Sequence, residues 1–442
     1  MANGKVSTAS DAHRPGMNAT LGDPWVLGVS AGFIILFIAF SIYDVDLLST
    51  VVSSGHAWTA KYLGSYFQLL LLLTFFIALG VCASPAGSAV MGDLDEPEMS
   101  TFKWISIILC TLLAGGGVFF AAGEPVYHFI AQSPPAFDAE TGTAAAIKGA
   151  LAQSFMHWGF LAWAILGSLT SLVLMNAHYV KGQPLQPRTL LYPVFGERVM
   201  TGAFGGIVDA VCVIAVVAGT VGPIGFLATQ VAYGANVLFG VPDSFATQLV
   251  VLIVLGAIYV PSAVTGIHRG IQILSRFNVF LALGIAAFIL IFGPTLFLLN
   301  AWLQGFGAYI SSFFEMATMT TETAPAWWMK WWTVFFFAWF LGYGPLMALF
   351  VARISRGRTV RQMILAVAVA APIATTVWFT LLGGSGIFYQ LNGAIDLKEA
   401  LTNFQFDVAT LTVAQALPLG GLMAFLILVL TTIFVATTGD SM

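Results

Sequence analysis

The chain has 442 residues, of which 59% are apolar and 8% are charged, whereas soluble globular proteins carry about 25% charged residues. This composition excludes a soluble enzyme, and a net charge of −4 gives no indication of a nucleic-acid partner. Apolar stretches of about 18 residues or more recur along the chain, and each can cross a hydrocarbon core of about 30 Å as a helix. The residues from Val279 to Leu299 lack the alternation that a β-barrel strand requires. The sequence therefore predicts an all-α polytopic membrane protein.

Ten membrane-spanning helices are predicted after a polar N-terminal tail. Residues 1–24 lack the apolar core and the cleavage site of a signal peptide, so we expect a short cytoplasmic tail that is not removed. The predicted spans are 25–46, 64–88, 103–130, 147–178, 203–238, 246–263, 277–300, 329–352, 363–387 and 409–438.

The distribution of Lys and Arg predicts that the N-terminus is cytoplasmic. With that topology most basic residues lie in inside segments, as the positive-inside rule requires, and the opposite topology would reverse the bias. The inside residues are Lys5, Arg14, Lys103, Lys181, Arg188, Arg198, Arg269, Arg276, Arg353, Arg356, Arg358 and Arg361. The outside residues are Lys61, Lys148, Lys330 and Lys398.

Two short segments between spans are predicted to lie along the membrane surface. Residues 304–319 are weakly amphipathic and carry Glu315, which predicts a helix at the outer surface. Residues 267–276 would be its inner counterpart.

The third predicted span contains three successive glycines, within Ala114 to Gly117, which weaken a regular helix. Two interpretations are open: small residues let another helix approach closely, or the segment unwinds and its carbonyls coordinate an ion or substrate. Glu124 and Pro125 are expected to end this helix near the outer side. The carboxylate there would be a gate, a proton carrier or one half of a helix-terminal pair.

Aromatic side chains gather in the fourth span, which carries His157, Trp158 and Trp163. Interfacial belts explain many Trp residues in membrane helices, and a lone histidine is more often a buried, satisfied side chain than a ligand or proton relay. These three residues alone therefore do not define a site.

The eighth span is the most aromatic segment of the chain. Behind the Trp residues at its outer end, Trp339, Phe340 and Tyr343 lie deeper, beside glycines and a proline that weaken the helix. A desolvated aromatic face attracts a cation by about 0.5 to 2 kcal/mol. This group suits a permanent cation that has no N–H to satisfy.

Hydroxyl groups also occur in apolar surroundings, at Thr220 in the fifth span and at Thr437 and Thr438 in the last. An isolated Thr commonly bonds back to the carbonyl four residues earlier, but two adjacent hydroxyls are suitable ligands for a small cation such as Na⁺. The sequence has no phosphate-binding glycine loop, Cys/His metal spacing or nucleophile elbow. These absences argue against an ATP-driven pump and against an enzyme.

Taken together, these stretches resemble the betaine/choline/carnitine transporter family. The run from Ala352 to Arg361 resembles the family's signature loop, and it follows an aromatic helix as it does there. Further matching stretches, in order, are Gly123 to Pro125, His157 to Trp163, Gly270 to Ser275, Gly293 to Thr295, Thr376 to Phe379 and Thr437 to Ser441.

The resemblance implies two inverted five-helix repeats, preceded by two extra N-terminal helices and assembled as a homotrimer. The extra helices would occupy 25–102, the first repeat 103–300, an extracellular amphipathic connector 301–328 and the second repeat 329–442. The family has twelve spans and this sequence predicts ten, so we expect the second repeat to be truncated.

The resemblance also implies an aromatic substrate box. Its residues in this sequence are Trp158, Trp163, Trp339, Phe340 and Tyr343. Phe340 and Tyr343 stand where the family usually has Trp, and Leu166 where a box Tyr is often found. Because Trp is the best cation–π partner, this departure leaves room for a sulfonium, a longer betaine or an amino sulfonate as substrate.

Na⁺ is the coupling ion that the resemblance implies, with no other cofactor. The first Na⁺ site would use Phe434, Thr437, Thr438 and the backbone around Leu113. A second Na⁺ site, only half formed, would use Thr220, with Val216 at the partner position one turn earlier.

These observations predict a Na⁺-coupled importer of a betaine-like quaternary ammonium or related zwitterion of the glycine betaine, carnitine and choline class. It would work by alternating access in the inner (plasma) membrane, with substrate and membrane lipid as partners. A proton-coupled carrier or a Na⁺-independent exchanger of the same family is an alternative. So is a truncated binding protein that does not transport.

Overall fold

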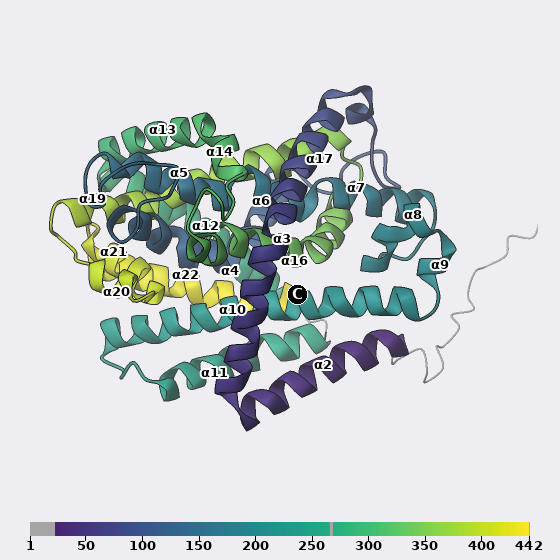
Figure 1. Cartoon of the computed structure of the whole chain (residues 1–442), viewed down its shortest axis with the longest axis horizontal. Helices are drawn as coiled ribbons and strands as arrows, with labels where there is room; N and C mark the ends of the chain where they lie inside the picture. Colours follow the sequence, from purple (N-terminus) through teal and green to yellow (C-terminus); the bar gives the residue numbers. More distant parts are fainter. Residues whose placement is uncertain (1–22, 266–267, 442) are drawn as a thin grey trace, which may run out of the picture.

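The computed structural model describes residues 23–265 and 268–441, and every regular element within these ranges is a helix (Figure 1). The one β pairing in the described chain is an isolated bridge between Val90 and Thr359. Helices satisfy their own backbone hydrogen bonds, which is what a lipid environment demands. The predicted all-α fold is therefore confirmed, whereas nearly all of the predicted tail lies outside the described residues.

The described chain forms helices from Pro24 to Ser441, in the following order. First come α2 (Pro24–Tyr43), α3 (Val45–Ala83), η1 (Pro85–Ser88), α4 (Thr101–Ile130), α5 (Ala146–Trp158), α6 (Phe160–Gly167), α7 (Leu169–Met175) and η2 (Asn176–Val180). Next come η3 (Pro187–Leu191), α8 (Tyr192–Phe195), α9 (Glu197–Met200), α10 (Ala203–Phe239), α11 (Phe245–Thr265), α12 (His268–Phe292) and α13 (Thr295–Ser311). Last come α14 (Phe313–Ala317), α15 (Ala326–Trp331), α16 (Thr333–Ile354), α17 (Val360–Leu365), η4 (Ala366–Ala370), α18 (Ala371–Phe379), η5 (Thr380–Gly384), α19 (Ser385–Leu391), α20 (Lys398–Thr402), η6 (Phe406–Val408), α21 (Ala409–Ala416) and α22 (Gly420–Ser441).

Six helical stretches of the described chain are long and apolar enough to cross a membrane, and the bent pair α12 and α13 would be a seventh. The multi-pass membrane protein is thus confirmed. Shorter apolar helices occur within α11 and α22. The number of ten spans stays a prediction, as does the pairing of the helices into inverted repeats.

Of the two interpretations of the glycine run in α4, the unwound segment is wrong. The helix continues through Ala114 to Gly117, and Glu124 and Pro125 do not end it, because it runs on to Ile130. An unpaired backbone N–H or C=O is costly away from water, so hydrogen bonding outweighs the low helix propensity of glycine. The glycines instead leave room for aromatic rings, as described below.

Breaks occur in the fourth predicted span, 147–178, where the sequence indicated one helix. Gly159 and Ser168 leave the helical conformation and divide the segment into α5, α6 and α7. Trp158 therefore ends α5, whereas Trp163 lies in α6. Two Trp side chains that were expected on one helix are carried by two.

Three other predicted boundaries also change. The inner surface helix expected at 267–276 is not separate, because its described residues are the first turns of α12, which begins at His268. The outer helix expected at 304–319 corresponds to the end of α13 together with α14, and α13 begins at Thr295 after a bend of 107° from α12. The last span, 409–438, is two helices, α21 and α22.

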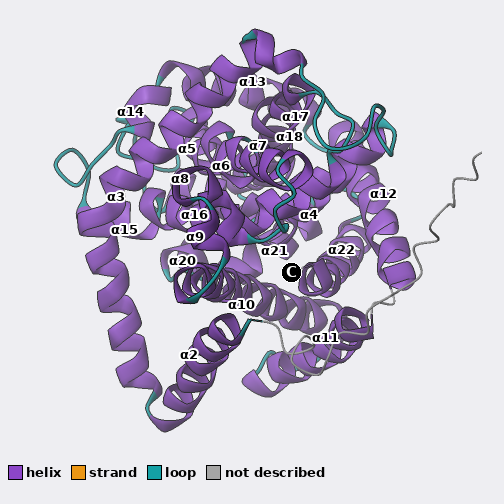
Figure 2. Ribbon diagram, turned by 90° about the vertical axis from the view of Figure 1, so that its right-hand side faces the viewer, coloured by secondary structure: helices purple, strands orange, loops and turns teal. Residues whose placement is uncertain are grey.

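Helices α2 and α3 lie at the edge of the molecule, and they diverge from their junction in both views (Figures 1 and 2). By contrast, α5 and α6 lie inside, where nearly all of their residues are buried. The helix α5 packs against α4 and α13, and α6 packs against α16. The candidate site is built on these interior helices.

Candidate functional site

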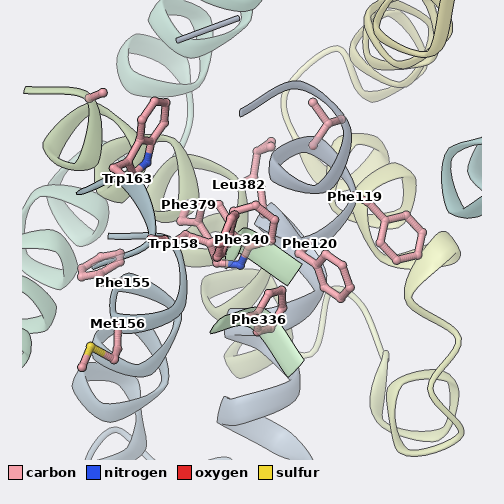
Figure 3. Close-up of a cluster of buried hydrophobic side chains, with 14 of the residues drawn as sticks. Phe119, Phe120, Phe155, Met156, Trp158, Trp163, Phe336, Phe340, Phe379 and Leu382 are labelled. Carbon is pink, nitrogen blue, oxygen red and sulfur yellow. The ribbon is translucent and has the colours of Figure 1, made fainter. Parts of the chain in front are cut away.

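An aromatic cluster lies between α5 and α16 and faces α4. The ring centroids of Trp158 and Trp339 are 5.9 Å apart, with an angle of 82° between the planes, and those of Trp158 and Phe340 are 5.4 Å apart, at 84°. Trp339 and Phe340 are stacked at 6.0 Å. Figure 3 shows Trp158 and Phe340 side by side with Phe379. We call Trp158, Trp339 and Phe340 the aromatic cage.

Two glycines allow these rings to reach the backbones of α4 and α10. A Cβ at Gly116 would lie 2.5 Å from Cη2 of Trp158 and 2.6 Å from Cη2 of Trp339. A Cβ at Gly219 would lie 2.6 Å from Cε2 of Tyr343. Gly116 of the glycine run in α4 thus allows close packing, and its partners are aromatic rings rather than another helix backbone.

The indole N–H groups of the cage are held by acceptors of the protein. Nε1 of Trp158 donates to Oε2 of Glu124 at 2.8 Å, and Nε1 of Trp339 donates to the carbonyl of Gly219 at 3.1 Å. The edge of an aromatic ring is its positive part and the face its negative part. Since the edges are tethered, the faces are what these rings can offer to a ligand.

Tyr343 joins the cage to the fifth predicted span. Its ring lies 6.5 Å from that of Trp339, and its hydroxyl is 3.0 Å from Oγ1 of Thr220. Thr220 in turn donates to the carbonyl of Val216 at 2.7 Å. Two hydroxyls and one carbonyl therefore come together at the position of the second predicted Na⁺ site.

Trp163 lies apart from the other predicted box residues. Its Nε1 donates to Oγ1 of Thr375 on α18 at 3.1 Å, and among the described side chains it makes no ring contact with the cage. Figure 3 shows its ring separated from the group around Trp158 and Phe340. The structure brings four of the five predicted substrate residues into ring contact, and Trp163 is the exception.

Most of the first predicted Na⁺ site lies beyond what the structure describes. The side chains of Leu113, Thr437 and Thr438 are outside the described residues, whereas Phe434 is buried on α22. The helix α22 packs against α4, the helix that carries Leu113. The elements that would form this site are therefore adjacent.

Sequence reasoning missed three phenylalanines that surround Trp158. The ring centroids of Phe336, Phe379 and Phe120 lie 5.2, 5.3 and 5.9 Å from that of Trp158. Phe336 precedes Phe340 by four residues, so the two side chains share one face of α16. Helical spacing was the signal that could have found Phe336, whereas Phe379 comes from a distant segment.

A group of buried titratable side chains lies directly behind Trp158. Oε1 of Glu124 is 2.6 Å from Nδ1 of His157 and 3.4 Å from Nε2 of His128. All three side chains are fully buried. Ionisable residues inside membrane helices are rare and usually functional. The sequence analysis considered Glu124 and His157 separately. Nothing in the sequence indicated that their side chains are in contact, because they lie on different helices.

The loop at 352–361 folds against the segment that joins α3 and α4. Nε of Arg356 pairs with Oδ1 of Asp93 at 2.7 Å, and the guanidinium of Arg358 lies 4.7 Å from the ring of Trp104. The Arg356 guanidinium beside Asp93 holds the pKa of that carboxyl below its ordinary value. Two segments that were predicted to lie on the same side of the membrane are therefore in contact.

These features define a class of protein. A multi-pass helical membrane protein with aromatic rings and ionisable groups gathered between its helices has the character of a membrane transporter. The chain belongs to the betaine/carnitine/choline transporter family, whose model matches residues 25–442. The predicted family is confirmed, and the protein is a transporter rather than an enzyme.

Similar proteins come from several bacteria. Glycine betaine transporter 2 of Vibrio parahaemolyticus is 48% identical over 94% of this chain and 76% of its own length. The glycine betaine transporter OpuD of Bacillus subtilis is 32% identical over 91% of this chain and 78% of its own length. The high-affinity choline transport protein of Escherichia coli K12 is 33% identical over 85% of this chain and 55% of its own length.

Proposed function

We propose that this chain is a secondary transporter that imports a betaine-like zwitterion together with Na⁺ by alternating access. The aromatic cage is the observation that carries the proposal. A trimethylammonium group has no N–H and needs no acceptor, so ring faces alone can hold it, with about 0.5 to 2 kcal/mol from each desolvated ring. Trp158 and Trp339 offer such faces because their N–H edges are already engaged.

Glycine betaine is the first substrate to test. Two of the relatives are named for glycine betaine and one for choline, and both compounds carry a trimethylammonium group. Phe340 replaces an indole in this cage, and Phe is a weaker cation–π partner than Trp. We therefore expect every substrate of this protein to carry a trimethylammonium or similar cationic headgroup, whereas the remainder of the substrate molecule can vary.

Alternating access is supported by the packing of the cage. The three rings contact one another directly, at centroid separations between 5.4 and 6.0 Å. A headgroup can enter only when the rings separate, and Trp158 and Phe340 belong to different helices, α5 and α16. Movement of these two helices relative to each other would separate the rings and admit the substrate.

Na⁺ coupling is supported by the oxygens near the cage. Thr220, Val216 and Tyr343 bring together hydroxyl and carbonyl oxygens, the ligand type that hard cations prefer. An ion there would act on the cage through Tyr343. The second candidate is proton coupling, which the buried contact between Glu124 and His157 favours.

The orientation in the membrane is part of the same proposal, with the N-terminus inside and the protein a homotrimer in the inner membrane. The contacts of Arg188 with Asp23 and of Arg356 with Asp93 support placing the segments of each pair on one side of the membrane, and the excess of Lys and Arg in the predicted inside segments favours the cytoplasmic side. Accessibility of an introduced cysteine in the loop at 352–361 to an impermeant reagent would test it.

The decisive experiment is uptake of labelled glycine betaine into proteoliposomes that contain the purified full chain. We expect accumulation with an inward Na⁺ gradient and none when K⁺ replaces Na⁺. Accumulation driven by an inward proton gradient alone would show that the protein is a proton-coupled carrier instead. Exchange without accumulation would indicate an exchanger, and binding without either would leave a binding protein.

Matched tryptophan variants connect this uptake to the cage. Trp158→Ala should abolish uptake, whereas Trp58→Ala should not, because Trp58 lies on α3 with 57% of its surface exposed. Equal uptake by both variants would show that the substrate binds elsewhere. Loss in both would indicate a general loss of folded protein, which the fraction of protein that elutes as a single species in detergent would reveal.

A further inference from the structure

The three titratable side chains behind Trp158 form a compact group, which we call the Glu-His-His cluster: Glu124, His128 and His157. Their nearest ligand atoms all lie within 4.8 Å of one another. Glu124 and His128 are one turn apart on α4, and His157 comes from the facing end of α5. The cluster is thus held by two packed helices, and all three of its members are buried.

The geometry suits a proton better than a metal ion. Two ligands of one tetrahedral Zn²⁺ are separated by about 3.3 Å, given bonds of about 2.0 Å. Nδ1 of His157 and Oε1 of Glu124 are 2.6 Å apart, which is the distance of a strong charge-assisted hydrogen bond. The other carboxylate oxygen already accepts from Nε1 of Trp158. The separation of these two atoms therefore fits a hydrogen bond between the imidazole and the carboxylate better than two ligands of one Zn²⁺.

The surroundings of His157 fit both of its protonation states. Nε2 of His157 faces the side-chain amide of Gln153 at 2.9 Å and the hydroxyl of Thr333 at 3.1 Å. A hydroxyl can donate or accept, and an amide can present its oxygen or its nitrogen after a half-turn. Oε1 of Gln153 has no hydrogen-bond partner among the described residues. After a half-turn of the amide, this oxygen can accept from an added proton on Nε2 of His157.

His128 offers a second position for a proton. Neither of its ring nitrogens has a hydrogen-bond partner in the part of the chain that the structure describes. Its ring lies 4.6 Å from that of Trp332 and 5.0 Å from that of Trp328. Those indoles can stabilise an imidazolium through their faces. Both histidines can thus gain charge beside one carboxylate.

Outside the cluster, the elements α4, α5, α15, α16 and η6 carry five other charged side chains. They are Lys103, Lys148, Lys330, Arg353 and Asp407. Lys330, for example, donates to the hydroxyl of Ser53 of α3.

We propose that Glu124, His128 and His157 form a buried proton-binding site whose added proton competes with the quaternary ammonium group at Trp158. This inference rests on the proposed function, because it requires the cage to bind a cation. The indole of Trp158 is the link, since its N–H donates to Glu124 and its ring forms part of the cage. A negative carboxylate at the N–H makes the indole face more attractive to a cation.

The sign of the coupling follows from the charges. With both histidines neutral the cluster has one negative charge, and an added proton cancels it. Bound cation and added proton therefore disfavour each other, so substrate binding releases a proton to the buffer. By linkage, substrate affinity falls as the pH falls through the titration of the cluster, by at most about tenfold per pH unit for one proton.

Calorimetry of glycine betaine binding tests this directly on the purified full chain in saturating Na⁺. In buffers of different ionisation enthalpy, the observed enthalpy should change in the direction of proton release. Glu124→Gln keeps an oxygen for the N–H of Trp158 but removes the charge. It should lose the buffer dependence and change affinity by less than about twofold between about pH 5 and about pH 8. His178→Gln, which alters a histidine outside the cluster that contacts the carbonyl of Gln183, should retain the wild-type profile.

Each other result contradicts the proposal. A buffer-independent enthalpy in the wild type would mean that no proton is exchanged, and proton uptake would be the signature of symport instead of competition. An unchanged pH profile in Glu124→Gln would place the proton elsewhere. The wild-type calorimetry decides the first two points even if the variant fails to fold.

A ligand-free measurement separates this inference from the proposed function. Infrared difference spectra of the wild type between about pH 8 and about pH 5 should contain imidazole and carboxylate bands that are lost in Glu124→Gln. If glycine betaine and choline both fail to bind while these bands are present, the proposed function is wrong and the proton site stands. If the bands are identical in both proteins, the proton site is wrong.

Discussion

Two apolar helical segments of this protein are α2 and the stretch from α5 to η2. The more apolar of the two, α2, is the less buried. The mean hydropathy of the most apolar window is 2.4 in α2 and 1.7 in residues 146–180. Yet 6% of the first window is buried, against 72% of the second. In water the more apolar segment would be the buried one. In this protein the interior segment is the more polar, because lipid tails solvate apolar side chains as well as protein does.

This difference in burial and polarity indicates that functional side chains of a membrane helix are found among its buried polar residues. The end of α5 buries Gln153, Ser154 and His157, and all three make hydrogen bonds. The outward residues of α2, such as Ile35 and Leu36, are apolar and exposed. In α5 the hydrogen bond of His157 leads to Glu124, and Glu124 in turn accepts from Trp158 of the cage.

The largest expected effect tests this contrast with two phenylalanines. Phe336→Ala should lower the free energy of unfolding by about 3 to 5 kcal/mol, because Phe336 is fully buried among Trp158, His157 and Phe120. Phe33→Ala should change it by less than about 0.5 kcal/mol, because Phe33 is 47% exposed on α2. Unfolding of both variants by dodecyl sulfate in mixed micelles measures the difference. Equal losses would mean that α2 is buried in the native assembly.

A smaller effect, with opposite signs, is expected from two glycine substitutions. Gly116→Ala places a methyl group against Trp158 and Trp339 and should destabilise the protein by about 1 to 3 kcal/mol. It should also weaken glycine betaine binding, since the cage rings must shift. Gly32→Ala meets no described atom within 4 Å and should stabilise α2 by up to about 1 kcal/mol through helix propensity. The same micelle titration and a binding isotherm measure both. A stabilising Gly116→Ala would show that the rings do not rest on α4.

Much of the fold was predictable because membrane helices are bounded by charges and turns. The start of α2 and the limits of α10 agree with the sequence within a few residues. The helix α3 begins at Val45 instead of residue 64, because a helix can continue beyond its apolar part with a polar sequence. The break at Gly159 was not predictable, since it depends on the fit between α5 and its neighbours.

The candidate site was predictable only in part. Trp339 and Phe340 are adjacent in sequence, and the family resemblance supplied Trp158 from another helix. The contact between Glu124 and His157 joins residues 33 positions apart, and neither residue has a pattern that indicates the other. Periodicity places side chains on a helix face, but the rotation of one helix against another decides which side chains meet.

The smallest expected effect concerns the polar attachment of α2. Asp23 caps this helix, and its Oδ2 accepts from Nη2 of Arg188 at 2.7 Å, while Arg188 also pairs with Asp209. Asp23→Asn should cost less than about 1 kcal/mol, because Asp23 is partly exposed and such pairs are weak. Arg188 keeps its second partner in this variant, so only the attachment of α2 is weakened.

The same pair has a pH dependence with a definite sign. The Arg188 guanidinium beside Asp23 holds the pKa of that carboxyl below its ordinary value of 3.8. The folded state thus binds fewer protons at this carboxyl than the unfolded state, so the stabilisation is present above that value and is lost as the pH falls through the lowered pKa. Proteolysis at α2, compared between about pH 6 and about pH 3, should increase at low pH in the wild type and change less in Asp23→Asn. An equal acid response in both proteins would show that another group governs how α2 is held.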